Sequence, residues 1–261
     1  MEVSRYVAYT YYMRNVLNIL YQTAKSSFKL RNESSYLGIF WYLLGPLLTF
    51  GILYYVFSGR LGSGVGDYPL YLLSGIVVWN FYSAGSSRSL TAIMGNAGII
   101  KALPVRRDAI VISGMIDAFV SHLFEIAILL AFCAILGTLT PIALLFSAVL
   151  LLQFLFALGT GFLLSALYVF FGDLGQIWSV LTKAWWFATP IFYTLSEGGP
   201  GKTLSMFNPM YHSIELSRNL LVYGILPPLS SWVILALFSV LTLVLGYAVF
   251  HKLSPRFAEF I

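Results

Sequence analysis

The feature that most restricts the fold of this chain is a series of six apolar runs, each long enough to cross a lipid bilayer. The hydrocarbon core of a bilayer is about 30 Å thick, which about 20 helical residues span. The runs cover approximately residues 36–57, 69–87, 109–136, 141–171, 175–195 and 231–250. We therefore predict an all-α membrane protein with a six-span transmembrane domain over residues 34–261.

Composition supports a polytopic membrane protein. The 261 residues are 59% hydrophobic and 10% charged, whereas soluble domains are about 25% charged. The net charge of +5 is small and scattered, so we expect no nucleic-acid partner. Cys133 is the single cysteine, and the histidines lie in separate segments, so neither a disulfide framework nor a metal site is expected.

Residues 1–33 differ from the apolar runs because polar and basic residues alternate with aromatic ones. Tyr9, Met13, Val16 and Leu20 fall on one helical stripe, which favours an amphipathic helix lying in the membrane surface. A solvated coil is the alternative. The segment has no apolar region followed by a small-residue cleavage site, so we predict no cleaved signal peptide.

Lysine and arginine predict the orientation. One side of the predicted membrane carries eleven of them, in the N-terminal segment, between spans two and three, and in the tail. The other side carries three, at positions 60, 202 and 218. Because cytoplasmic segments are enriched in these residues, we place both termini in the cytoplasm.

The segment Phe170–Tyr193 carries an aromatic and hydroxyl stripe at helical spacing. Its members are separated by 4, 3, 1, 3 and 4 residues and are Trp178, Thr182, Trp185, Trp186, Thr189 and Tyr193. One interpretation is a face that holds an amphipathic ligand inside the bilayer. The alternative is an interfacial aromatic belt or ordinary packing.

Three charged residues fall inside predicted spans. Asp117 and Glu125 share a face of span three, and Lys183 lies in span five. The carboxylates would serve either as an acid–base pair of a membrane enzyme or as a structural partner of Lys183, and we favour the structural pair.

Two segments outside the spans have features of their own. Met94–Asp108 has an apolar centre and basic ends, and either connects two spans or forms a short cytoplasmic helix that exposes Ile99, Ile100 and Leu103 to a partner. Asn208, Pro209 and Gly224 delimit a second short helix. On it Glu215 precedes Arg218 by three residues, a spacing that favours a local ion pair between them. We expect this helix to rest at the outer surface, either as a plain surface helix or as a gate.

Gly201-Lys202-Thr203 lacks the glycine and the strand of a phosphate-binding loop, so no nucleotide site is predicted.

Six motifs in order resemble one known family. They are YLGIFWYLLGPLL (36–48), YPLYLLSGIVVWNFY (68–82), IIKALPVRRD (99–108), VFFGDLGQI (169–177), WFATPIFYTL (186–195) and FNPMYHSIELSRNLL (207–221). Their order and spacing, over nearly the whole chain, are similar to the membrane subunit of type-2 ABC exporters of polysaccharides. One departure is Gly172, where the family commonly has arginine.

The resemblance implies a homodimer of six-span subunits docked on two copies of a cytoplasmic ATPase, which binds ATP and magnesium, so this chain itself needs no cofactor. It implies that residues 1–33 form an interface helix, and that spans one and five line the channel, with Phe50 and Tyr54 facing the stripe. It also implies a coupling helix and an outer cap. The coupling residues are Ile99, Ile100, Lys101, Leu103 and Arg106, and the cap residues are Asn208, Pro209, Tyr211, Glu215 and Arg218.

We therefore expect a permease that moves a lipid-linked polysaccharide, such as an O-antigen, across the cytoplasmic membrane of a bacterium. The alternatives are an ABC exporter of drugs or lipids, a membrane enzyme that uses Asp117 and Glu125 on lipid-linked sugars, and a passive channel.

Overall fold

The computed structural model describes residues 40–59, 65–102, 105–195 and 199–261. The expected interface helix at 1–33, the first residues of span one and Leu103 lie outside these ranges. Every regular element within them is helical. The elements are α2 (Phe40–Phe57), α3 (Tyr68–Gly95), α4 (Ala97–Ala102), α5 (Arg107–Ile135), η1 (Pro141–Leu145), α6 (Phe146–Phe170), α7 (Leu174–Ala188), α8 (Pro200–Ser205), α9 (Pro209–Leu221), α10 (Leu229–Leu253), η2 (Ser254–Arg256) and α11 (Phe257–Phe260).

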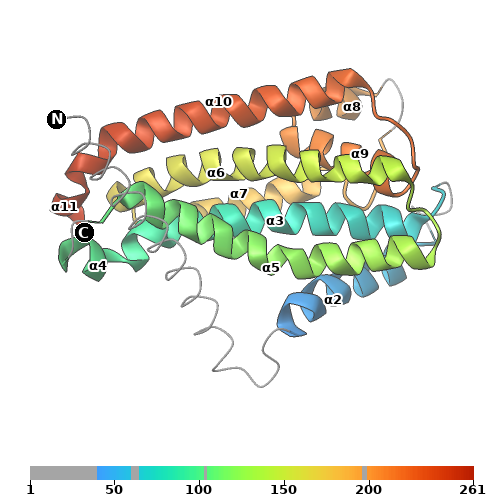
Figure 1. Cartoon of the computed structure of the whole chain (residues 1–261), viewed down its shortest axis with the longest axis horizontal. Helices are drawn as coiled ribbons and strands as arrows, with labels where there is room; N and C mark the ends of the chain where they lie inside the picture. Colours follow the sequence, from blue (N-terminus) through green and yellow to red (C-terminus); the bar gives the residue numbers. More distant parts are fainter. Residues whose placement is uncertain (1–39, 60–64, 103–104, 196–198) are drawn as a thin grey trace, which may run out of the picture.

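The long helices form a bundle with α3 at its centre (Figure 1). Helix α3 packs against α2, α5, α6, α7 and α9, and α10 packs along α6. The short helices α4 and α11 lie at the end of the bundle that contains the C-terminus, and α8 and α9 lie at the opposite end. This arrangement puts the expected coupling and outer helices at opposite ends.

Among the described residues, three helical segments are both long and apolar enough to cross a membrane. These are Arg107–Ile135, Pro141–Phe170 and Leu229–Arg256. Helix α3 has sufficient length, but its serines, tyrosines, Asn80 and Arg88 lower its mean hydropathy. Helices α2 and α7 have 18 and 15 residues. The all-helical membrane class is confirmed, and the count of six spans stays a prediction.

The predicted ends of spans two and five differ from the ends of the corresponding helices in the structure. The second span, predicted to end at residue 87, continues as helix to Gly95 because Arg88 finds polar partners inside the bundle, namely Asp117 and the Ser121 hydroxyl. The fifth span, predicted to reach 195, ends as helix at Ala188. Pro190 has no N–H to donate and forces Thr189 into an extended conformation, with φ of −95° and ψ of 133°.

Helix α9 also departs from the expected surface position. Its capping is as predicted: the Asn208 side chain accepts a hydrogen bond from the Met210 N–H, Pro209 begins the helix, and Gly224 has φ of +61°. However, most of α9 is buried among α3, α6 and α10. The Ser217 hydroxyl and the Arg218 guanidinium donate to backbone carbonyls instead of water, so their polarity did not indicate exposure.

Candidate functional site: a groove between α3 and α7

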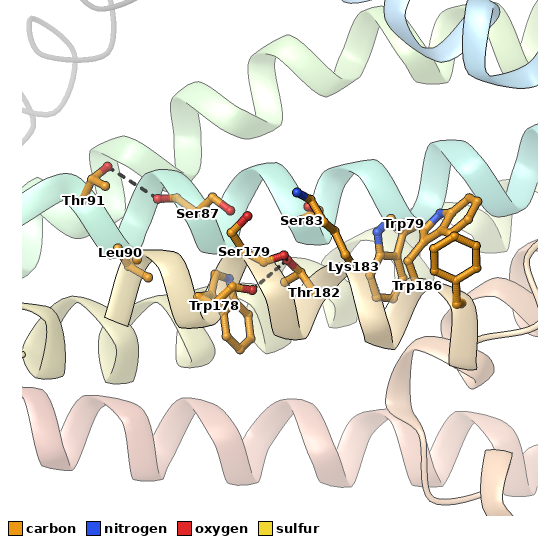
Figure 2. Close-up of a pocket in the computed structure, with 12 residues that line it drawn as sticks. Trp79, Ser83, Ser87, Leu90, Thr91, Trp178, Ser179, Thr182, Lys183 and Trp186 are labelled. Carbon is orange, nitrogen blue, oxygen red and sulfur yellow. Dashed lines mark hydrogen bonds between the residues drawn. The ribbon is translucent and has the colours of Figure 1, made fainter. Parts of the chain in front are cut away.

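A groove of about 390 Å³ lies between α3 and α7. Figure 2 shows its indole rings, hydroxyls and one ammonium group along the two helices. The groove follows α7 from Gly175 to Phe187, and these twelve helical rises of 1.5 Å give it a length of roughly 18 Å. Its lining comprises Trp79, Ser83, Ser87, Leu90, Thr91, Gly175, Trp178, Ser179, Thr182, Lys183, Trp186 and Phe187.

Helix α7 forms one wall because it is anchored to α3 through its aromatic face. The indole N–H of Trp178 donates to Ser86 Oγ on α3 at 3.2 Å. Thr182 is buried beneath the groove, and its hydroxyl donates to the Trp178 carbonyl at 2.8 Å within its own helix. The opposite face of α7 presents exposed apolar residues, among them Val180 and Leu181.

The predicted stripe divides between two surfaces. Trp178, Thr182 and Trp186 line the groove. Trp185 turns away and packs edge-on against Trp79 and Tyr82 of α3, because successive residues of a helix point about 100° apart.

The remaining stripe residues lie where the end of α7 meets the start of α9. The Trp185 indole donates to Asn208 Oδ1 at 3.0 Å, and the Asn208 amide donates to Thr189 Oγ1 at 2.9 Å. Tyr193 follows the end of α7, and its hydroxyl donates to the Phe187 carbonyl at 3.1 Å. These side chains join α7 to the start of α9.

The two aromatic residues expected opposite the stripe lie elsewhere in this subunit. Phe50 stacks on Tyr54 within α2 and meets Phe132 of α5 edge-on. Tyr54 stacks on Tyr68 at the beginning of α3. Within one subunit, the wall opposite α7 is therefore α3.

The α3 wall of the groove was not predicted from the sequence. Ser83, Ser87 and Thr91 recur at intervals of four, which is one face of a helix, and Trp79 continues the same face. That spacing matched the stripe on α7 and would have indicated a second polar face.

The intramembrane carboxylates have partners on α3. Asp117 forms an ion pair with Arg88 at 3.3 Å. Glu125 accepts a hydrogen bond from the Asn80 amide at 3.2 Å and lies 3.7 Å from His122 Nδ1. The favoured pairing with Lys183 is therefore wrong, because both carboxylates point toward α3.

Arg218 of α9 is buried, with 1% of its surface exposed. Its guanidinium donates to the carbonyls of Tyr71, Pro190 and Ile191 at 3.2, 2.9 and 2.7 Å. It also stacks on the Tyr71 ring, 3.4 Å from the centroid. The expected local pair with Glu215 is replaced by these backbone contacts, and Glu215 and Tyr211 remain half-buried.

The predicted coupling segment lies at the opposite end. Helix α4 buries none of its residues; Ile99 is 47% exposed, Lys101 is exposed and Ile100 is half-buried. Arg106 donates through Nε to Asp108 Oδ1 at 2.9 Å. Helix α4 thus exposes the apolar side chain of Ile99 and the basic side chain of Lys101 at the surface. Its role in coupling stays a prediction.

Comparisons with known proteins agree with this architecture. The family model described as ABC-2 type transporter matches residues 20–222. The O-antigen export system permease protein RfbA of Klebsiella pneumoniae is 28% identical over 96% of this chain and 98% of its own length. The protein of the same name from Myxococcus xanthus is 26% identical over 93% and 95%. The polysialic acid transport protein KpsM of Escherichia coli is 27% identical over 82% and 85%.

Proposed function

The chain belongs to the ABC-2 type transporter family, and from this premise we propose that it is the permease subunit of an exporter of lipid-linked polysaccharide. Two copies would pair in a bacterial cytoplasmic membrane, with both termini in the cytoplasm. Two copies of a separate ATPase would bind ATP and magnesium. The proposed substrate class follows the names of the relatives, which export O-antigen or transport polysialic acid.

The observation that carries the proposal is the groove between α3 and α7. A sugar ring has an apolar C–H face that packs on an aromatic ring, while its hydroxyls need hydrogen-bonding partners in place of water. The groove supplies both, since Trp178 and Trp186 alternate with the hydroxyls of Ser83, Ser87 and Ser179. Several weak sites in a row allow a polymer to advance, whereas a single strong site would retain it.

The enzyme alternative loses its candidate residues. Asp117 is ion-paired with Arg88, and Glu125 is held by Asn80. Neither carboxylate lines the groove. A carboxylate that acts as a general base must reach its substrate, so these two are better explained as bundle-stabilising groups.

Removal of the two groove indoles tests the proposed path. In Trp178→Ala/Trp186→Ala, we expect export to fall by roughly 10-fold or more, because loss of stacking on each ring costs about 0.5–1.5 kcal/mol. The measurement is the amount of polymer at the cell surface, normalised to the amount of permease in the membrane. Trp232→Ala on α10 is the matched control, because Trp232 is half-buried and outside the groove. Normal surface polymer in the double variant would contradict the proposal.

Charge reversal on α4 tests the proposed coupling role. Lys101 is exposed on a helix that buries no residue, so Lys101→Glu should leave the fold intact. We expect the amount of polymer exported per ATP hydrolysed to fall several-fold, because a repulsive contact at a docking surface weakens transmission. Export and phosphate release are measured together in membranes that contain both subunits. Lys252→Glu, exposed at the end of α10, is the control, and an unchanged ratio for Lys101→Glu would remove the assignment.

A further inference from the structure

Lys183 is the one charged side chain among the residues that line the groove between α3 and α7. Figure 2 shows it extending from α7 toward α3, beside Ser83. Its immediate surroundings are the indoles of Trp79 and Trp186 and the hydroxyls of Ser83 and Ser179. The ammonium group therefore faces the space that a ligand would occupy.

The charge of Lys183 has no structural partner within the described ranges, since the ion pairs found there join other residues. The two carboxylates of α5 that were considered as its partners are already engaged: Asp117 with Arg88, and Glu125 with Asn80. An unpaired ammonium group at membrane depth is costly, so such a residue is a functional candidate by default.

The serine hydroxyls that line the groove with Lys183 can donate hydrogen bonds to a ligand. The hydrogen bonds formed within the described residues leave the Oγ atoms of Ser83, Ser87 and Ser179 without an acceptor. Thr182 differs, because its hydroxyl is used by its own helix. A cation beside hydroxyl donors is suited to an oxyanion, because ammonium and hydroxyl groups both donate to negatively charged oxygen.

Lysine also suits an anion that must move on. Its ammonium is a compact charge on a flexible stem, whereas an arginine would hold a carboxylate or phosphate in a fixed bidentate geometry. The contact with each passing anion would be strong enough to guide it and brief enough to release it.

We propose that Lys183 is the point in this groove that binds an anionic group, a carboxylate or a phosphate, carried by the exported glycolipid. This rests on the proposed function and specifies its substrate chemistry. The anion is either a charge on the sugar repeat or the phosphate that joins the sugar to its lipid.

The test measures binding by tryptophan fluorescence, because Trp79, Trp178 and Trp186 share the groove with Lys183. The full-length chain in lipid nanodiscs is titrated with tetragalacturonate, inorganic pyrophosphate and neutral maltotetraose. We expect Lys183→Met to weaken binding of at least one anion by about tenfold and to leave maltotetraose binding unchanged. Lys183→Arg should keep anion binding, and the exposed control Lys252→Met should match the wild type.

The probes separate the sources of the anion and the two proposals. Dependence on Lys183 for tetragalacturonate indicates a charged sugar repeat, and dependence for pyrophosphate indicates the lipid-linked phosphate. Equal anion affinities in the wild type and Lys183→Met, no anion binding by the wild type, or equal losses for neutral and charged probes would each overturn the inference. A failure of the proposed function would give a different result. The wild type would not bind neutral maltotetraose, whereas its affinity for an anionic probe would still depend on Lys183.

Discussion

Replacing Arg218 with methionine is expected to destabilise this protein by about 3–5 kcal/mol, because three buried carbonyls lose their donor at a cost of about 1–3 kcal/mol each. The guanidinium donates to three backbone carbonyls, those of Tyr71, Pro190 and Ile191. Pro190 interrupts the helical pattern after α7, so the carbonyls at 190 and 191 depend on Arg218 for donors. Methionine keeps much of the side-chain volume and leaves all three carbonyls unsatisfied in a buried place.

Thermal unfolding in detergent measures this effect, and we expect the melting temperature of Arg218→Met to fall by roughly 10 °C. Arg218→Lys should give an intermediate value, because it keeps the charge but has a single nitrogen for three acceptors. The exposed Arg256→Met is the control for the loss of one positive charge. A melting temperature equal to that of the wild type would show that α9 and α3 stay joined without the guanidinium.

Gly246→Ala is expected to destabilise the bundle by about 3 kcal/mol, the upper part of the usual range for overpacking a core. Helices α6 and α10 meet backbone to backbone, with Gly159 opposite Gly246. A Cβ added at Gly246 would overlap the carbonyl oxygen of Gly159, and one added at Gly159 would overlap the backbone of Thr242 and Leu243. Backbone atoms cannot rotate aside, so the two helices would have to separate.

Gly51→Ala provides a control with the opposite sign. Gly51 lies inside α2, and a Cβ there would meet no atom within 4 Å. This variant should be stabilised by about 0.5–1 kcal/mol, because alanine loses less backbone entropy than glycine in a helix. Thermal unfolding of the two variants in the same detergent makes the comparison. Equal melting temperatures for Gly246→Ala and Gly51→Ala would contradict the close backbone contact between α6 and α10.

The candidate site was predictable from the sequence in part. Trp178, Thr182 and Trp186 were placed on one face by their spacing, and they line the groove. Trp185 was assigned to the same stripe, because a helical face defined by spacing alone is wide enough to include adjacent residues. In the structure it packs on Trp79 and Tyr82 instead. Lys183 was expected to pair with a carboxylate of span three, but it lines the groove together with Trp79 and Ser83 of α3.

The polar partners were predicted least well. One of the two carboxylates, Asp117 or Glu125, was expected to pair with Lys183, but Asp117 pairs with Arg88, which follows the predicted end of span two at residue 87. Arg218 was expected to pair with Glu215 but binds carbonyls from α3 and from the segment after α7. Both contacts join residues far apart in the sequence, so no local spacing indicates them.

The sequence by itself determined the all-helical membrane class, the start of η1 at Pro141 and the capped helix that begins at Pro209, because apolar length, proline and capping side chains act locally. The tertiary structure decided that α3 is the central helix, that α9 is buried, and that the groove has α3 as its second wall. These outcomes depend on which faces meet in the bundle. A polar side chain can satisfy its hydrogen bonds with water or with another helix, and only the packed arrangement determines which partner it has.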